Sequence, residues 1–204
     1  FQFDDRNLLS KEWIAGLDGF NTNVSLDSVG TRPILLWSFA ANNHLDDKNT
    51  FGFHLVNLTL HILVTLLIFT VLIRIKKVIS KGYISQYQAN HKLVHKTTGT
   101  LFIPFSTTLI FALHPINTDA VTYISSRSSL LATFFYLLTI HFFVETLIPS
   151  RTVKNRLSLA LLTILGTYLA LASKLIAITL PVIILFLFLV HHVPKYFPDS
   201  AQYF

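Results

Sequence analysis

The chain has 204 residues, of which 52% are hydrophobic and only 13% are charged. Soluble domains usually carry about a quarter charged residues, and here the apolar residues form long runs, so the composition excludes a soluble globular domain and predicts an integral membrane protein. The net charge is +6, and the absence of cysteine excludes disulfides, thiol nucleophiles and cysteine metal sites. Because the sequence starts without Met and ends just after the last apolar run, we expect an internal piece of a longer membrane protein.

The first fifty residues are polar and predict a loop outside the bilayer, with short surface helices at 8–17 and 33–42. Asp4 and Asp5 follow Phe1 and Phe3, as if a spanning helix ended just upstream. Adjacent carboxylates in a loop are commonly just solvated. They are also what a sugar-transfer reaction requires as the base that removes the proton of an acceptor hydroxyl.

Five apolar runs follow and predict membrane-spanning helices, at 53–73, 101–113, 130–148, 157–172 and 175–190. About 20 residues are needed to cross a bilayer, and the second run is shorter because it ends at the His114-Pro115 turn. The sequence therefore predicts an all-α, polytopic transmembrane bundle at 53–193. An outer loop at 1–52 precedes it, and a following loop begins at 194–204.

The basic residues predict the orientation of the bundle. The loops at 74–96 and 151–156 are strongly basic and fall on one side if the runs alternate, whereas the first fifty residues hold seven acids against four basic residues. Cytoplasmic loops carry the excess of Lys and Arg. The N-terminal segment is therefore expected in the periplasm of a bacterial inner membrane, with the lumen of the endoplasmic reticulum as the alternative, and the charge requires no nucleic-acid partner.

Polar side chains interrupt the first apolar run. His54, Asn57 and His61 lie at i, i+3 and i+7, so they share one face of a helix. A polar face on a spanning helix points at protein or at a wet cavity, because lipid cannot satisfy it. For Asn57 and His61, hydrogen bonding between helices is an equal alternative. His54 is nearest the outer end and is the better candidate for lining a cleft.

Further polar residues stand at the expected outer helix ends. The segment from His114 to Asp119 is typical of a proline turn with helix caps. Arg127 and Lys174 lie within a turn or two of an outer helix end. They either extend to the interface as isolated cations or clamp a lipid phosphate, which lies at the same depth.

Several of these stretches occur together, in this order and at this spacing, in one family. The specific ones are FGFHLVN at 51–57 and HPINTDAV at 114–121, and weaker agreement comes from Phe3-Asp4-Asp5, Arg32-Pro33-Ile34, Ser126-Arg127-Ser128 and Ser173-Lys174. From Phe3 to about Val190 the chain resembles the membrane part of the transmembrane and tetratricopeptide-repeat O-mannosyltransferases (TMTC) and their bacterial relatives.

The resemblance implies a GT-C glycosyltransferase. Such an enzyme moves a mannose-like sugar from a polyprenyl-phosphate carrier to a protein or glycan hydroxyl on the outer face of the membrane, and no metal or other cofactor is indicated. The implied roles are base for Asp4 or Asp5, phosphate binding for Arg127, Lys174 and Arg32, and cleft lining for His54, Asn57, His114 and Asp119. The tetratricopeptide repeats would lie beyond Phe204.

The chain departs from the family at three positions. Ser129 and Leu175 stand where the family usually has acids, and Asn117 stands at the second histidine of the family's HPIHTEAV stretch. The lost acids leave open a non-catalytic membrane subunit derived from a glycosyltransferase. A transporter or lipid flippase using the polar face of 53–73 is a further alternative. The concentration of polar residues at the outer helix ends, rather than at the midplane, favours the transferase.

Overall fold

A computed structural model describes residues 32–46, 49–87, 101–148 and 151–196 of the chain. The helices in these ranges are α3 (Pro33–Asp46), α4 (Thr50–Tyr87), α5 (Phe102–Leu113), α6 (Thr118–Thr122), α7 (Arg127–Thr146), α8 (Val153–Ser173) and α9 (Leu180–Tyr196), with the 3-10 turns η2 (Pro115–Asn117) and η3 (Leu175–Thr179). The described part is helical, which confirms the all-α prediction.

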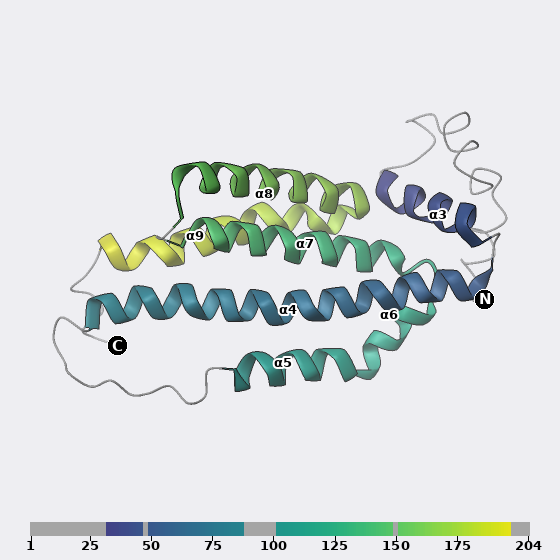
Figure 1. The fold of residues 1–204 in the computed structure, drawn as a ribbon, viewed down its shortest axis with the longest axis horizontal. Helices are drawn as coiled ribbons and strands as arrows, with labels where there is room; N and C mark the ends of the chain where they lie inside the picture. Colours follow the sequence, from purple (N-terminus) through teal and green to yellow (C-terminus); the bar gives the residue numbers. More distant parts are fainter. Residues whose placement is uncertain (1–31, 47–48, 88–100, 149–150, 197–204) are drawn as a thin grey trace.

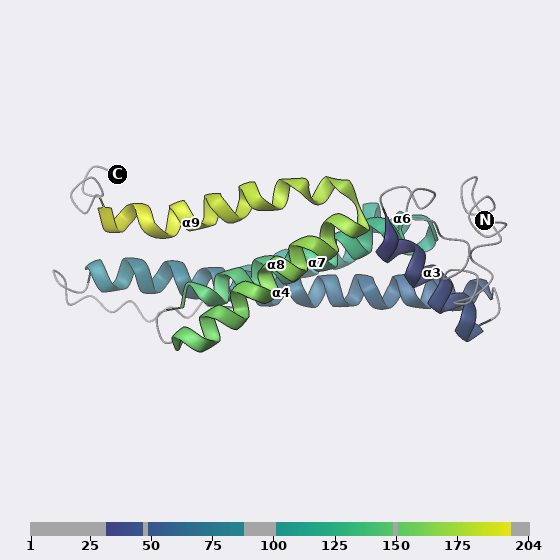
Figure 2. The ribbon, with the colours of Figure 1, turned by 90° about the horizontal axis from the view of Figure 1, so that it is seen from above.

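The long helices run side by side (Figures 1 and 2). Helix α7 packs against α4 and against α8, while α5 packs against α4 alone among the long helices. Helix α3 lies at the end of the bundle where α4 begins, and α4, α7 and α9 run in the same direction while α5 and α8 return (Figure 1). The starts of α4, α7 and α9 therefore share one end of the bundle with the last turns of α5 and α8.

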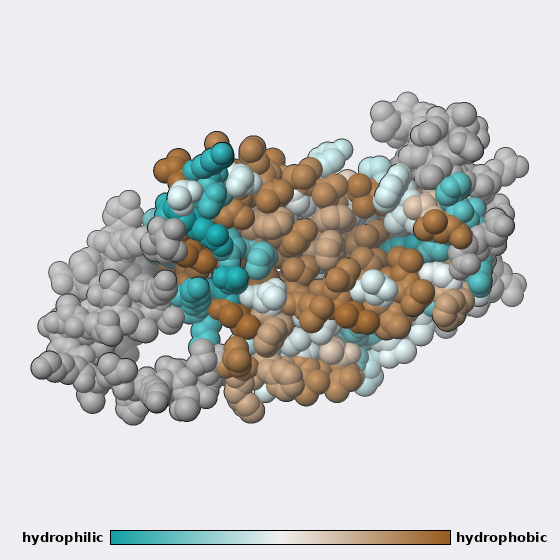
Figure 3. Space-filling view, in the orientation of Figure 1, coloured by the Kyte–Doolittle hydropathy of each residue, from teal (hydrophilic) through white to brown (hydrophobic). Residues whose placement is uncertain are grey.

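Four segments of the described chain are long and apolar enough to cross a membrane: Thr50–Val78, Arg127–Thr146, Val153–Ser173 and Leu175–His192. Figure 3 shows the corresponding apolar belt between two more hydrophilic ends. The remaining expected run forms the apolar helix Phe102–Leu113. Its 12 residues reach only about 18 Å, short of the ~30 Å hydrocarbon core, so it does not cross the bilayer as a single straight helix.

The helices begin earlier than the apolar runs predict. Helix α7 starts at Arg127 rather than at residue 130, and α8 starts at Val153 rather than at residue 157. The start of α8 is fixed by Thr152, whose side chain accepts a hydrogen bond from the backbone N–H of Asn155. Apolar runs mark contact with lipid, whereas helix ends depend on backbone hydrogen bonds, so the two boundaries need not coincide.

The predicted helix at 33–42 is confirmed as α3, but it does not lie loosely on the surface. Leu35 and Phe39 are buried against Phe53 of α4, together with Ile124 and Leu131. The opposite face of α3 is exposed. The buried face fixes α3 to the starts of α4 and α7, where the candidate site lies.

Helices α7 and α8 approach each other closely at Gly166. A Cβ atom at this position would lie 2.4 Å from Oγ1 of Thr139 on α7, well inside van der Waals contact. In membranes, small residues at helix contacts allow such an approach, and packing rather than hydrophobic exclusion then stabilises the pair. Gly166 therefore sets the spacing of the two helices that carry the candidate phosphate-binding cations.

Candidate functional site

Arg127, at the first residue of α7, is fully buried and hydrogen-bonded to two other helices. Its Nε donates to Asn57 Oδ1 at 2.9 Å, and its Nη1 donates to the Ser38 carbonyl at 3.3 Å. Its Nη2 donates to Asn42 Oδ1 at 3.0 Å and to the Phe53 carbonyl at 2.9 Å. These bonds join α3, α4 and α7 at one point.

The faces of the Arg127 guanidinium are covered by aromatic rings. The Cζ atom lies 4.7 Å from the centroid of Phe39 and 5.2 Å from that of Phe53. Cations over aromatic faces are attracted by the ring quadrupole, and more strongly when water is excluded. The four hydrogen-bond acceptors around Arg127 are amide and carbonyl oxygens, so neutral dipoles and rings surround this charge in the part of the chain that the structure describes.

The polar face of α4 holds neighbouring segments together. Asn57 is fully buried and, besides accepting from Arg127, donates from Nδ2 to the carbonyl of Tyr123 at 2.8 Å. His61 Nε2 lies 3.4 Å from the carbonyl of Ala112, and its ring stacks on Phe111. Asn57 and His61 therefore form hydrogen bonds from α4 to neighbouring segments. His54, one turn nearer the start of α4, is exposed.

Helix α5 ends at the His114-Pro115 turn, and the short helical segments η2 and α6 follow it. The Nδ1 atom of His114 accepts from the backbone N–H of Ile116 at 3.2 Å, and Asn117 Nδ2 donates to the carbonyl of Phe111. These side chains satisfy backbone groups that the break leaves free, as a cap does.

The break lies inside the apolar belt, on the side of its middle toward the start of α4. Ala112, which precedes it by two residues, is level with His61, and His61 is near the middle of the span Thr50–Val78. His114 and Asp119 are nevertheless exposed. Irregular backbone and exposed polar groups at this depth occur where other protein covers them or where they line a water-filled cavity.

Lys174 crosses from the end of α8 to the first turn of α7. Its Nζ donates to Ser129 Oγ at 2.8 Å, and the side chain is half-buried. Ser129 is neutral, so this contact orients the ammonium group without neutralising its charge. Leu175, the other position at which an acid is missing, is 58% exposed.

Comparison with known proteins identifies the family. Two proteins named protein O-mannosyl-transferase TMTC1, from mouse and human, are each 36% identical over 107 residues, or 52% of the chain. The Caenorhabditis elegans protein O-mannosyl-transferase F38B6.6 is 31% identical over 165 residues, or 78% of the chain. The chain belongs to the TMTC family. It matches 9%, 10% and 19% of the length of these three TMTC relatives, respectively.

Neither a protein-family model nor a solved structure matches this TMTC chain. The curated relatives nevertheless confirm the resemblance drawn from FGFHLVN and HPINTDAV, and the four apolar helices of spanning length confirm an integral membrane protein.

The structure places the described site residues of this TMTC chain in the half of the bundle that contains the start of α4, but not in a single cluster. Asn57 and Arg127 are in contact, and Lys174 reaches the same first turn of α7. Helices α5 and α8 lie on opposite sides of the α4–α7 pair (Figure 1), so His114 and Lys174 are on different sides of it.

The remaining predicted residues are less constrained. Arg32 is exposed directly before α3. Asp4 and Asp5 lie outside the described residues, so their role as base stays a prediction. In the described ranges no group of three or more His, Asp or Glu side chains is placed to hold a metal ion.

Asn42 is the residue of this site that the sequence did not single out. It lies 85 positions before Arg127, and its side-chain oxygen accepts from Nη2 of that arginine. The available signal was the pair Asn42-Asn43 directly after the mostly apolar stretch 34–41, since both are buried and a buried amide requires partners.

Proposed function

We propose that this chain is part of a membrane glycosyltransferase that moves a mannose-like sugar from a polyprenyl-phosphate carrier to a hydroxyl of a protein or glycan. The names of the curated relatives support mannosyl transfer to oxygen. The lipid carrier and a GT-C fold come from the family resemblance. The observation that carries the proposal is the attachment of Lys174 to the first turn of α7, beside the Arg127 network, at one end of the bundle.

The proposed chemistry is direct displacement at the anomeric carbon. The acceptor oxygen forms a bond to this carbon, the bond from the carbon to the phosphate oxygen breaks, and polyprenyl phosphate leaves with the electron pair. Asp4 or Asp5 takes the proton of the acceptor hydroxyl. Such a reaction needs a cation at the departing phosphate, and no step in it requires a metal or other cofactor.

Lys174 is the side chain best suited to bind that phosphate. Its ammonium group is held by a neutral hydroxyl and is half-buried, and electrostatic attraction to an anion is stronger in such a partly dry place than in water. An ammonium group has three N–H donors, and the bond to Ser129 uses one. Two donors remain for phosphate oxygens.

Arg127 supports the site in a different way from the one predicted. Four of its hydrogen bonds go to protein oxygens and its faces are covered by rings. We therefore assign it a positioning role, in which it fixes α3 and hence the exposed Arg32 relative to α7. Direct contact of Arg127 with the phosphate stays a prediction, and it would require these protein bonds to be exchanged.

We propose that this end of the bundle faces the periplasm or the lumen of the endoplasmic reticulum. The support is the basic character of the opposite end, where α4 carries Arg74, Lys76 and Lys77, and where the segment from Arg151 to Arg156 follows α7. Short basic loops are retained on the cytoplasmic side.

The test is sugar transfer by the full-length protein from polyprenyl-phosphate mannose to an acceptor. Lys174→Gln is expected to lower kcat by about 10²-fold, which is typical for loss of one group that stabilises developing charge. The matched control is Ser129→Ala, which removes the hydroxyl but keeps the ammonium group, and it should keep kcat within about ten-fold of wild type because a single neutral hydrogen bond is lost.

A second experiment tests the base. The double variant Asp4→Asn, Asp5→Asn is expected to abolish transfer while polyprenyl phosphate still binds. Intact turnover in this variant would show that the base has been assigned wrongly. Lipid or solute transport by the wild-type protein in proteoliposomes, without sugar transfer, would favour the transporter, and binding of polyprenyl phosphate without any transfer would favour a non-catalytic subunit.

A further inference from the structure

Lys174 lies at the start of a short 3-10 turn between two spanning helices. It ends α8 in an extended conformation and begins η3, which runs from Leu175 to Thr179. Runs of 3-10 helix longer than about four residues are uncommon, because their hydrogen-bond geometry is poorer than that of an α-helix. The five residues of η3 therefore depend on contacts with neighbouring helices, and the position of Lys174 depends on the same contacts.

Helix α7 holds η3 at two points. At the start of η3, Lys174 Nζ donates to Ser129 Oγ at 2.8 Å. At the end of η3, the hydroxyl oxygens of Thr179 and Tyr136 are 3.2 Å apart. Thr179 donates its own hydrogen to the carbonyl of Ile176 at 3.1 Å, so Tyr136 is the donor in the pair with Thr179. A chain of two hydrogen bonds thus runs from α7 through Thr179 to the backbone of η3.

The spacing of the two attachment points fits the geometry of η3. Ser129 and Tyr136 are seven residues apart, so they share one face of α7 and are separated by about 10 Å along its axis. Lys174 and Thr179 are five residues apart, which also corresponds to about 10 Å in a 3-10 turn but to only about 7.5 Å in an α-helix. The 3-10 conformation therefore suits a turn that is bonded to α7 at both ends.

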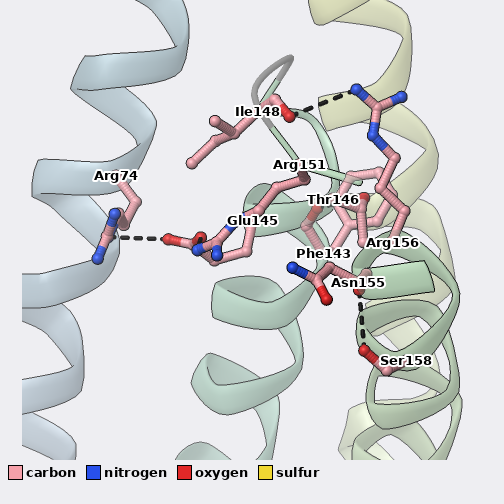
Figure 4. A network of polar contacts seen from close by, with 9 residues as sticks. All are labelled: Arg74, Phe143, Glu145, Thr146, Ile148, Arg151, Asn155, Arg156 and Ser158. Carbon is pink, nitrogen blue, oxygen red and sulfur yellow. Dashed lines mark hydrogen bonds and ion pairs between the residues drawn. The ribbon is translucent and has the colours of Figure 1, made fainter. Parts of the chain in front are cut away.

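Helix α7 is itself fixed to α4 near both of its ends. The Arg127 network fixes its start. Near its end, the Glu145 side chain is only 4% exposed; its Oε1 lies 2.9 Å from Nε of Arg74 on α4, and its Oε2 is paired with Nη2 of Arg151 (Figure 4). A turn that is bonded to α7 is therefore held in place relative to α4 as well.

Tyr136 and Ser129 hold different parts of this turn. Ser129 binds the end of a long, flexible side chain, whereas Tyr136 is bonded through Thr179 to the turn that carries this side chain. Tyr136 lies near the middle of the apolar span Arg127–Thr146, where a hydroxyl without a partner is costly, so this bond is retained. Its ring packs against the buried cluster that includes Ala177 of η3. A phenylalanine at this position would keep the ring and lose only the bond.

We infer that Tyr136 is a positioning residue for Lys174. Its hydrogen bond to Thr179 fixes η3 on α7 and thereby holds the Lys174 ammonium group where the polyprenyl phosphate leaves. Tyr136 does not bind the phosphate, because it lies two turns of α7 deeper in the apolar belt than Ser129. The inference rests on the proposed phosphate-binding role of Lys174 and adds a second residue that acts through it.

The test is sugar transfer by the full-length protein from polyprenyl-phosphate mannose. Tyr136→Phe is expected to lower kcat by about three- to ten-fold, which corresponds to the loss of one hydrogen bond between helices in a membrane, and to leave KM for the acceptor unchanged. Thr179→Val should have the same effect, whereas Thr179→Ser keeps the hydroxyl and should restore kcat. The matched control is Tyr168→Phe, which removes a hydroxyl at an exposed position of α8 and should change kcat less than about two-fold.

A double variant separates positioning of Lys174 from general support of the bundle. In a protein that already carries Lys174→Gln, adding Tyr136→Phe should cause no further loss of kcat, because the cation that Tyr136 positions is gone. A residue that only supports the bundle would lower kcat by the same factor with and without Lys174→Gln. That result, or an unchanged kcat in Tyr136→Phe alone, would overturn the inference.

Hydrogen exchange of the backbone amides of Leu175–Thr179 provides a measurement that does not depend on activity. Exchange should be faster in Tyr136→Phe and in Thr179→Val than in the wild type, and Thr179→Ser should match the wild type. Equal exchange in all four proteins would show that Tyr136 does not fix η3. An unchanged kcat in Lys174→Gln would instead refute the proposed phosphate-binding role of Lys174, and with it the link from Tyr136 to the reaction.

Discussion

Replacing Arg127 by glutamine tests the positioning role that its contacts indicate. The substitution removes the charge and leaves the oxygens of Asn42, Asn57, Ser38 and Phe53 with at most the two N–H donors of one amide nitrogen in place of the guanidinium. A buried acceptor left without a partner costs about 1–3 kcal/mol, and such costs are not additive within one network. Loss of one partner in a buried charged network typically costs about 3–5 kcal/mol, and this is the expected destabilisation.

The assay is thermal unfolding of the full-length protein in detergent, followed by circular dichroism, with hydrogen exchange of α3 as the local measurement. For an unfolding unit of about 150–250 residues, the size of this membrane bundle, 1 kcal/mol corresponds to about 2–4 °C, so the Tm of the bundle's own transition is expected to fall by roughly 6–20 °C. Backbone amides of α3 should exchange faster, because Arg127 bonds two of its residues, Ser38 and Asn42. The control Lys154→Gln, at an exposed position, should stay within about 0.5 kcal/mol of wild type.

Arg127→Lys separates positioning from phosphate binding. Lysine keeps the charge but lacks the planar fork that reaches four acceptors, so it should recover only part of the stability. The reasoning would be refuted if Arg127→Gln unfolded within about 1 kcal/mol of wild type, which is the size of a single ordinary hydrogen bond. It would also be refuted if Arg127→Lys were as stable as wild type yet bound the polyprenyl-phosphate donor weakly.

Three other substitutions test contacts elsewhere in the bundle by the same unfolding measurement. Gly166→Ala should destabilise the bundle by about 1–3 kcal/mol, because its methyl group would overpack against Thr139. Adding Thr139→Ala to this variant should restore most of the lost stability. Equal losses with and without Thr139→Ala would contradict the overpacking. Glu145→Gln should lower the stability by about 1–2 kcal/mol, a modest value because water screens the two partly exposed arginines that pair with Glu145. A Glu145→Gln variant as stable as wild type would contradict this pairing. Asn117→Ala should cost about 1 kcal/mol by removing the side-chain hydrogen bond to the Phe111 carbonyl, which keeps only the backbone N–H of His114 as a donor. Thr118→Ala, at an exposed position, should not have this cost.

The spanning helices were predictable because lipid imposes a simple requirement on composition. A stretch in the hydrocarbon core must be apolar and must satisfy its own backbone, so helices near 53–73, 130–148, 157–172 and 175–190 followed directly from the sequence. The helix ends were not predictable in this way. Helix α7 includes Arg127 because protein oxygens, rather than water, solvate its guanidinium, and no rule based on hydropathy contains that information.

The site was predictable in its residue types but not in its pairings. Arg127, Asn57 and Lys174 stand out because polar groups are costly within apolar runs and therefore have partners or a function. Their partners lie far away in sequence: Asn57 is 70 positions from Arg127, and Ser129 is 45 positions from Lys174. Such pairings are decided by the packing of whole helices, here including the close approach at Gly166, and a single sequence does not state that packing.

The arginines at the two ends of the bundle differ in their burial and in the charge of their partners. Arg127 is enclosed and bonded to neutral oxygens of α3 and α4, which makes its surroundings stiff and keeps the ends of α3, α4 and α7 in register. A group-transfer site requires such stiffness, because small displacements of the groups that bind the leaving phosphate reduce the rate. Arg74 and Arg151 share one carboxylate and remain partly exposed. That arrangement leaves part of each guanidinium group in contact with solvent, whereas the Arg127 group is enclosed by protein.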